Sequence, residues 1–190
     1  MTEEEIKKIY QEYRVPHHVI KHMQAVADFA VDLGEKFQKK GYRIDLKTLK
    51  YAALLHDFLR VCDFCEMNLD HFSEDVNKDD LKFWQSLRDK YGKKGHEKAA
   101  FEVLEEMGKK EIANLVKMHD FWKVDELKSL EEKILFYADK RVEENRVVDL
   151  ETRFKNGRIR NKVTKEFIQK RNYTEEKTRK LERYLLKKLS

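Results

Sequence analysis

The sequence is poor in the residues that build tight turns. Only one proline and six glycines occur among 190 residues. An all-β fold needs such residues at frequent intervals, so this composition argues against it. Charged residues make up 41% of the chain, and Lys, Glu and Leu are abundant, as amphipathic helices require. The sequence therefore predicts a soluble all-α protein with the length of one domain.

Long apolar runs and a large net charge are also missing. No apolar run approaches the roughly twenty residues of a membrane span, and the start "MTEEEIKKIY" lacks the basic and then apolar layout of a secretion signal. We therefore expect a cytoplasmic protein without a membrane partner.

The net charge of +5 is a small difference between 41 basic and 36 acidic residues, most of which solvate helix faces. The last thirty residues carry a basic excess that would permit a phosphate-rich partner.

Cysteine is scarce as well, because the chain has only Cys62 and Cys65. Their Cys-x-x-Cys spacing fits a zinc or redox site when a second pair or a thioredoxin-like βαβ context is present. The sequence contains neither, so we expect two free thiols.

The spacing of apolar residues predicts helices over 18–39, 45–59, 96–107, 110–121 and 129–154. Asp45 is a predicted N-cap, Ser129 and Glu132 form a predicted capping box, and Gly108 is a predicted helix end. A turn is expected at 156–158, before closing helices whose apolar residues are Phe167, Leu181, Tyr184, Leu185 and Leu189.

Residues 61–94 break this helical pattern, and we expect them to form a short helix between loops that acts as an insertion or lid. Aromatic residues here and near 121 are expected to pack in the core or the lid rather than to bind a base: Phe64, Phe72, Phe83, Trp84, Phe121 and Trp122.

The stretch "YAALLHDFLR" places His56 and Asp57 on the buried side of a predicted helix. A buried carboxylate is unfavourable unless it is paired or binds a metal. Other inward polar residues follow along the chain, and the ordered set is His22, His56, Asp57, His96, His119 and Asp139. Imidazole nitrogen and carboxylate oxygen suit manganese, iron, cobalt, nickel or zinc. One such histidine alone is more often a core residue bonded to a carbonyl, but the whole set indicates a metal site.

Histidines outside this set are assigned to the surface or to loops: His17, His18 and His71. His18 is close enough to His22 in the sequence to compete with it as a ligand.

A histidine, then a His-Asp doublet, then a later aspartate on separate helices resembles the signature of the HD-domain metal-dependent phosphohydrolases. His22, the doublet at 56–57 and the "YAD" that ends at Asp139 carry this resemblance, which spans about residues 15–155. It implies a single-domain helical bundle, with an HD-type domain at 1–155, a metal site between its core helices, and basic C-terminal helices at 156–190 that pack on the same domain.

His96 in "GKKGHEKAA" and His119 in "VKMHDF" make the chain most similar to dinuclear branches of that family, which split dinucleoside polyphosphates and cyclic nucleotides. The resemblance implies two divalent ions per chain. His22, His56 and Asp139 would hold one ion, His96 and His119 the other, and Asp57 would bridge both.

The activity implied by the resemblance is hydrolysis of a phosphoester or phosphoanhydride bond in a nucleotide-type small molecule, by attack of a metal-activated hydroxide. The expected catalytic residues are Asp57, which would bridge the ions, and two arginines, Arg60 and Arg146. We expect these arginines to contact phosphate, because a guanidinium offers paired hydrogen bonds. Arg60 stands where many relatives have a lysine. Further candidates are Lys93, Lys94 and Lys140 for phosphate, and Asp120 for orienting a ligand histidine.

A nucleic-acid or protein-binding module that keeps the HD fold is the alternative, with the basic C-terminal helix as its contact surface. The Gly-Tyr-Pro element of the cyclic-di-GMP branch is missing, which disfavours that substrate. A pure binding module has no physical reason to keep a complete ligand set. We therefore favour the enzyme, and a small phosphorylated substrate over a nucleic acid.

Overall fold

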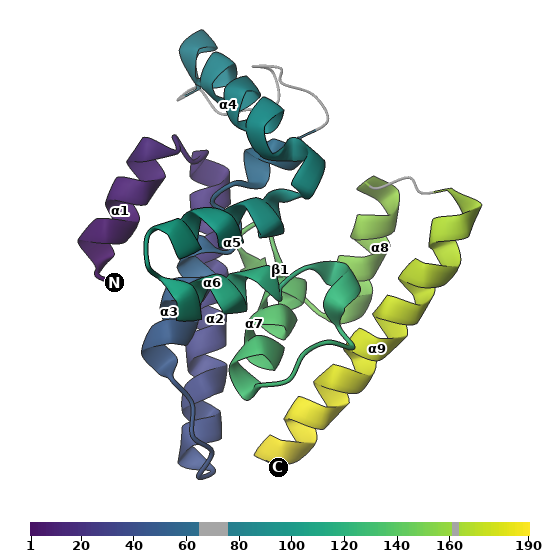
Figure 1. Ribbon diagram of the computed structural model, residues 1–190. Coiled ribbons are helices and arrows are strands. Elements are labelled where there is room, and N and C mark those ends of the chain that lie inside the picture. Colours follow the sequence, from purple (N-terminus) through teal and green to yellow (C-terminus); the bar gives the residue numbers. More distant parts are fainter. Residues whose placement is uncertain (65–75, 161–163) are drawn as a thin grey trace.

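The structure is a computed structural model that describes residues 1–64, 76–160 and 164–190, except for the side chain of Glu166 (Figure 1). Its helices are α1 Glu3–Glu12, α2 His17–Lys39, α3 Leu46–Leu55, α4 Lys78–Tyr91, α5 His96–Glu106, α6 Lys110–Lys117, α7 Leu130–Arg141, α8 Leu150–Arg160 and α9 Lys165–Leu189. Short 3-10 turns are η1 Arg60–Asp63, η3 Gly92–Lys94 and η4 Phe121–Lys123. The strands β1 Val142–Glu143 and β2 Arg146–Val147 form one small hairpin. The predicted all-α fold is confirmed.

The core lies around α2, which packs against both α3 and α7, while α6 joins α3 to α5. The buried side of α2 carries an apolar stripe at helical spacing: Met23, Val26, Ala30, Leu33 and Phe37. Gly34 lets α2 and α3 approach closely, because a Cβ atom there would lie 2.6 Å from Leu46 Cδ2. The helices that carry the candidate ligands are therefore held together by apolar packing.

Three predicted capping signals are confirmed. The Asp45 side chain accepts a hydrogen bond from Thr48 N at 3.0 Å, and Ser129 and Glu132 form the capping box of α7. Gly108 follows α5 with a φ of +72°, a conformation that favours glycine. These local signals depend on neighbouring residues, which is why the sequence reveals them.

The predicted helix over 129–154 is wrong, since α7 ends at Arg141 and a hairpin separates it from α8. Val142 pairs with Val147 across this hairpin, and Glu144 takes a positive φ of 54° in its turn. β-Branched residues favour extended backbone. Asp149 then stops the strand and accepts from Thr152 N at 2.8 Å, so a new helix starts there.

The predicted turn at 156–158 is also wrong, because α8 continues through these residues to Arg160. An isolated glycine such as Gly157 is tolerated within a helix at a modest cost. The domain boundary expected after residue 155 falls inside this helix. The last helix, α9, buries Leu181 and Leu185, as predicted. Phe167 and Tyr184 are exposed, although the sequence predicts them in the same apolar stripe.

The segment 61–94 contains η1, α4 and η3, and the predicted helix corresponds to α4. Trp84 is buried and Phe83 packs against the core, as expected for core or lid residues. Cys62 is a buried free thiol. Cys65, His71 and Phe72 lie outside the described residues. The function of the segment as a lid stays a prediction.

The helix predicted over 45–59 is shorter in the structure, because α3 ends at Leu55 and His56 is its C-cap. His56 and Asp57 therefore lie in the turn after α3 rather than within the helix.

None of the helices in the described ranges is long and apolar enough to cross a membrane.

Candidate metal centre

The structure brings the six predicted metal ligands together from different parts of the chain. They come from α2 (His22), the turn after α3 (His56 and Asp57), the first turn of α5 (His96), the turn after α6 (His119) and α7 (Asp139). The helix predicted over 110–121 is shorter in the structure, because α6 ends at Lys117. Their ligand atoms form two groups, in each of which all atoms lie within 4.8 Å of one another. The groups are His22, His56 and Asp139, and Asp57, His96 and His119.

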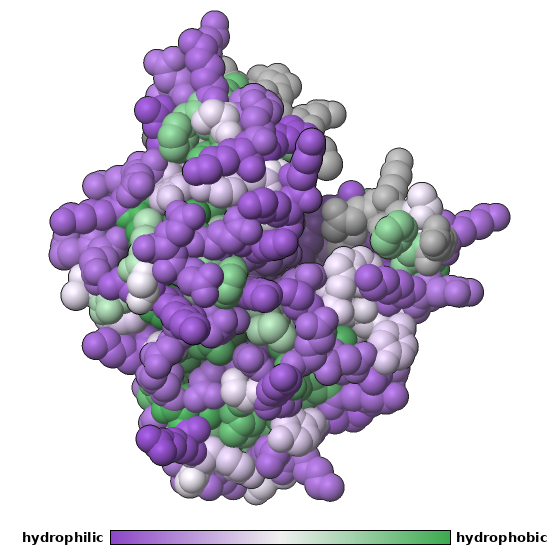
Figure 2. Space-filling model, viewed as in Figure 1, coloured by the Kyte–Doolittle hydropathy of each residue, from purple (hydrophilic) through white to green (hydrophobic). Residues whose placement is uncertain are grey.

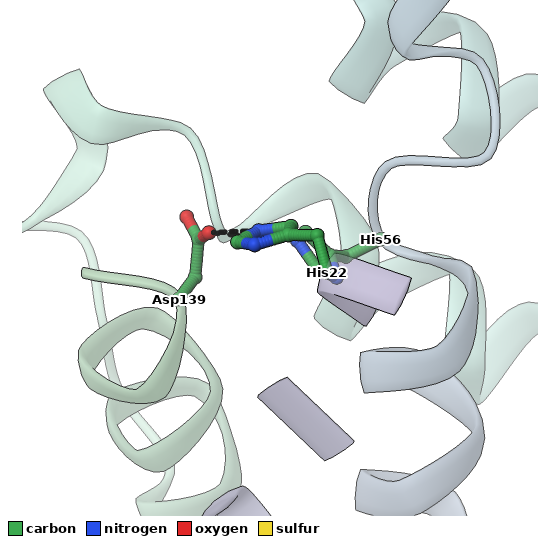
Figure 3. A group of neighbouring side chains, drawn as sticks. All are labelled: His22, His56 and Asp139. Carbon is green, nitrogen blue, oxygen red and sulfur yellow. Dashed lines mark hydrogen bonds and ion pairs between the residues drawn. The ribbon is translucent and has the colours of Figure 1, made fainter. Parts of the chain in front are cut away.

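Asp139 is the centre of the first group (Figure 3). Its Oδ1 lies 3.2 Å from His22 Nε2 and 3.5 Å from His56 Nε2. Two imidazole nitrogens and one carboxylate oxygen thus converge from three helical segments.

Asp57 is the centre of the second group and also faces the first. Its Oδ1 lies 2.8 Å from His96 Nε2 and 3.3 Å from His119 Nε2, while its Oδ2 lies 3.7 Å from His56 Nε2. This position between the two groups is the one expected for a carboxylate shared by two ions.

Each of the four histidines is oriented through its Nδ1 atom. The Nδ1–H of His22 donates to Glu144 O at 2.9 Å, that of His56 donates to Ala53 O at 2.8 Å, and that of His119 donates to Val116 O. A carbonyl oxygen only accepts hydrogen bonds, so these contacts place a proton on Nδ1 and turn Nε2, the nitrogen that would bind a metal, toward the aspartates.

His96 is oriented by a carboxylate instead, because its Nδ1 lies 2.5 Å from Asp63 Oδ2. Such a contact fixes the ring and makes the opposite nitrogen a better metal ligand. Asp63 and Glu97 also form a third possible ligand group with this Nδ1, but Nε2 already faces Asp57 and His119. We therefore assign Asp63 an orienting role.

The charges of the site support one another. Burial alone would raise the pKa of Asp57 and Asp139, but neighbouring cations hold both well below the usual range; His56 and His96 act on Asp57, and Lys140 acts on Asp139. Burial lowers the pKa of His96, yet the charge of Asp57 and the hydrogen bond to Asp63 outweigh this effect and raise the pKa to about 9. Both aspartates are therefore ionised and suited to bind a cation.

Two buried atoms of the site lack a hydrogen-bond partner within the described residues, namely His56 Nε2 and Asp57 Oδ1. His96 Nε2 and His119 Nε2 form ion pairs with Asp57 Oδ1 at 2.8 and 3.3 Å, which are not hydrogen bonds. Buried polar atoms are normally satisfied, so these two atoms indicate a missing partner. A divalent ion would be held by this ring nitrogen, once deprotonated, and by this carboxylate oxygen, and the donor set is one that transition metals prefer.

The two groups open into a cavity of about 1010 Å³. Figure 2 shows a largely hydrophilic face that is hollowed beside α8 and α9. The remaining wall of the cavity contains cations and aromatic rings, including Arg60, Lys140, Phe121, Trp122 and Phe154. Arg60 and Lys140, two of the residues predicted to contact phosphate, therefore line the cavity.

Other predicted residues are placed differently. Arg146 is exposed on β2 and lines a separate groove, because the helix expected to carry it ends at Arg141. Lys93 and Lys94 are not among the residues that line the cavity, and Lys94 pairs with Glu102 at 2.7 Å. Asp120 lines the cavity but caps η4 through Trp122 N, so it does not orient a histidine.

His18 lines the cavity next to Phe64 but belongs to neither ligand group, so it does not replace His22.

Two parts of the site were not predicted from the sequence. One is Asp63, for which the only signal was its place shortly after the doublet. The other is a set of arginines from α8 and α9 that line the cavity: Arg153, Arg158, Arg160 and Arg171. The sequence shows that these residues are basic, but it does not show that they line the cavity.

Comparison with protein families matches residues 19–142 to the family described as HD domain. The match covers well over half of the chain and contains all six ligand residues. Neither the curated proteins nor the solved structures contain a match.

Proposed function

The chain belongs to the HD-domain family, and we propose that it is a metal-dependent phosphohydrolase that cleaves a phosphoester or phosphoanhydride bond in a nucleotide-type small molecule. Members of this family are generally metal-dependent hydrolases. The observation that carries the proposal is the convergence of four Nε2 atoms on two ionised aspartates at one wall of a large cavity that cations also line.

The two ligand groups define where ions would bind. His22, His56 and Asp139 would hold one ion, His96 and His119 the other, and Asp57 would contact both. When bound, such ions activate water and neutralise phosphate charge. The orienting contacts of Nδ1 hold the ligand atoms in place before substrate arrives.

Arg60 and Lys140 are placed to hold phosphate oxygens next to the ligand groups. Arg60 Nη1 lies 3.2 Å from both ring nitrogens of His96, and nearly half of its side chain is exposed. Lys140 Nζ donates to Asp139 and, at 3.2 Å, to His119 O. Positive charge fixed beside the reacting phosphorus would stabilise the charge that develops on its oxygens.

A small substrate is favoured over a nucleic acid because several basic residues of α9 form ion pairs within the chain. Lys177 contacts Asp125 at 2.7 Å, and Arg179 contacts Glu151 at 2.5 Å. Binding of a polymer would need an extended track of free cations. Aromatic rings in the cavity wall suit a nucleobase.

A metal-loading experiment combined with phosphate release tests the proposal. Protein loaded with Mn, Fe, Co, Ni or Zn should contain about two ions per chain by elemental analysis and should release phosphate from at least one nucleotide in a screen that also includes short RNA. A His96→Ala/His119→Ala variant should keep about one ion, whereas His17→Ala, on the exposed start of α2, should keep both. Protein that binds no ion would refute the mechanism, and cleavage of RNA alone would favour the nucleic-acid alternative.

A further inference from the structure

Four arginines from α8 and α9 line the cavity, and three of them already face carboxylates of the chain. Arg158 and Arg171 both approach the buried Glu175, and Arg160 contacts Glu143 at 2.8 Å. The two carboxylates of Glu175 and Glu143 thus compensate half of the positive charge of these four arginines.

Arg153 is different from the other three. Within the described residues it forms no ion pair, and its buried Nε lacks a hydrogen-bond partner. A guanidinium has no acceptor atoms and stays charged at physiological pH, so a buried donor of this kind requires an acceptor. Arg153 lines the cavity, so a molecule bound in the cavity can supply an acceptor to its guanidinium.

Aromatic rings line the same cavity as Arg153 and the metal ligands. Lys140, next to Asp139, lies 5.8 Å from the centre of the Phe121 ring. The Phe121 ring is in turn 6.4 Å from that of Phe154, the residue that follows Arg153 on α8. Phe154 is buried, so a planar group would pack against the half-buried Phe121 ring, in the same cavity that the metal ligands and Arg153 line.

We propose that Arg153 binds a second phosphate group of the substrate, separate from the phosphate that reacts at the ligand groups. This inference rests on the proposed function and narrows its substrate to phosphate esters that carry a planar ring and two separated phosphates. The guanidinium fork matches two phosphate oxygens. The cavity, at about 1010 Å³, is also as large as the largest typical small-molecule sites, far larger than one phosphate needs.

The test compares the binding of two probes, adenosine 3′,5′-bisphosphate and adenosine 5′-monophosphate, to chelator-treated protein by calorimetry at one fixed salt concentration. We expect the bisphosphate to bind at least about tenfold more tightly than the monophosphate. Arg153→Gln should remove most of this preference, and Arg153→Lys, which keeps the charge but not the fork, should remove part of it.

Lys155→Gln is the matched control, because Lys155 is exposed on the same helix and does not line the cavity. It removes one positive charge from α8 and should leave the preference unchanged. Circular dichroism of each variant shows whether it is folded, and the folded Arg153→Lys protein decides the outcome if Arg153→Gln unfolds.

The outcomes separate this inference from the proposed function. An equal preference in the wild-type, Arg153→Gln and Arg153→Lys proteins overturns the second phosphate site, even if the loaded protein hydrolyses nucleotides. A loss confined to the Arg153 variants supports the site, even if no metal restores hydrolysis.

Discussion

Chelator-treated protein should lose stability as the pH rises from 6.5 to 9, and His96 is the main reason. Its pKa is raised from 6.5 to about 9 in the folded protein, because Asp57 and Asp63 outweigh the effect of burial. A group with a raised pKa stabilises the folded state fully below its unfolded pKa, and this contribution disappears as the pH passes the folded value. The loss should therefore fall between pH 6.5 and about pH 9.

The size of the effect follows from the same shift. One pKa unit corresponds to about 1.4 kcal/mol, so His96 contributes about 3 kcal/mol to the free energy of unfolding. The lowered pKa of Asp57 reflects the same pair and is not added again. The pKa of His56 is also raised, since Asp57 and Asp139 outweigh its burial, so it acts in the same direction. A loss of this size is large against a typical total of about 5–15 kcal/mol.

Urea unfolding at several pH values between 6 and 9.5, with chelator present, measures this loss. His96→Gln should show a clearly shallower decline, because it removes the main titrating group. Addition of a divalent ion should oppose the decline in the wild-type protein, since metal binding needs the neutral imidazole and becomes tighter as the pH rises. Parallel curves for the wild-type and His96→Gln proteins would refute the assignment of a proton to the His96–Asp57 pair.

Three further predictions concern the ligands and the fold. Asp57→Asn should lower the turnover of the loaded protein by several orders of magnitude and reduce its metal content in elemental analysis, because Asp57 lies between both ligand groups; wild-type turnover would make the doublet structural. Asp63→Ala should weaken binding of one ion about 10–100-fold in a chelator competition assay, whereas Asp120→Ala should not, and equal effects would remove the orienting role of Asp63. Leu185→Ala should lower the free energy of unfolding by about 2–5 kcal/mol in urea, whereas Leu186→Ala, on the exposed side of α9, should cost about 0.5 kcal/mol or less; equal costs would contradict the packing of α9.

The all-α fold and most helix starts could be predicted from the sequence, because they depend on information that is local in the chain. The six candidate ligands were chosen from the order of His and Asp residues along the chain. Apolar residues at helical spacing show which side of a segment is buried, and capping residues such as Asp45 and Ser129 act on their near neighbours. The chemical types of His56 and Asp57 in an apolar setting indicate a metal site without knowledge of their partners.

The tertiary structure decided how these ligands are oriented and what surrounds them. His22 is oriented by the carbonyl of Glu144, which is 122 residues away in the sequence and lies in a hairpin that helical periodicity did not reveal. Asp63 reaches His96 across 33 residues, and Arg153 enters the cavity only because α8 begins after that hairpin. Contacts between distant segments depend on how helices pack in three dimensions. The spacing of residues within one segment does not determine that packing.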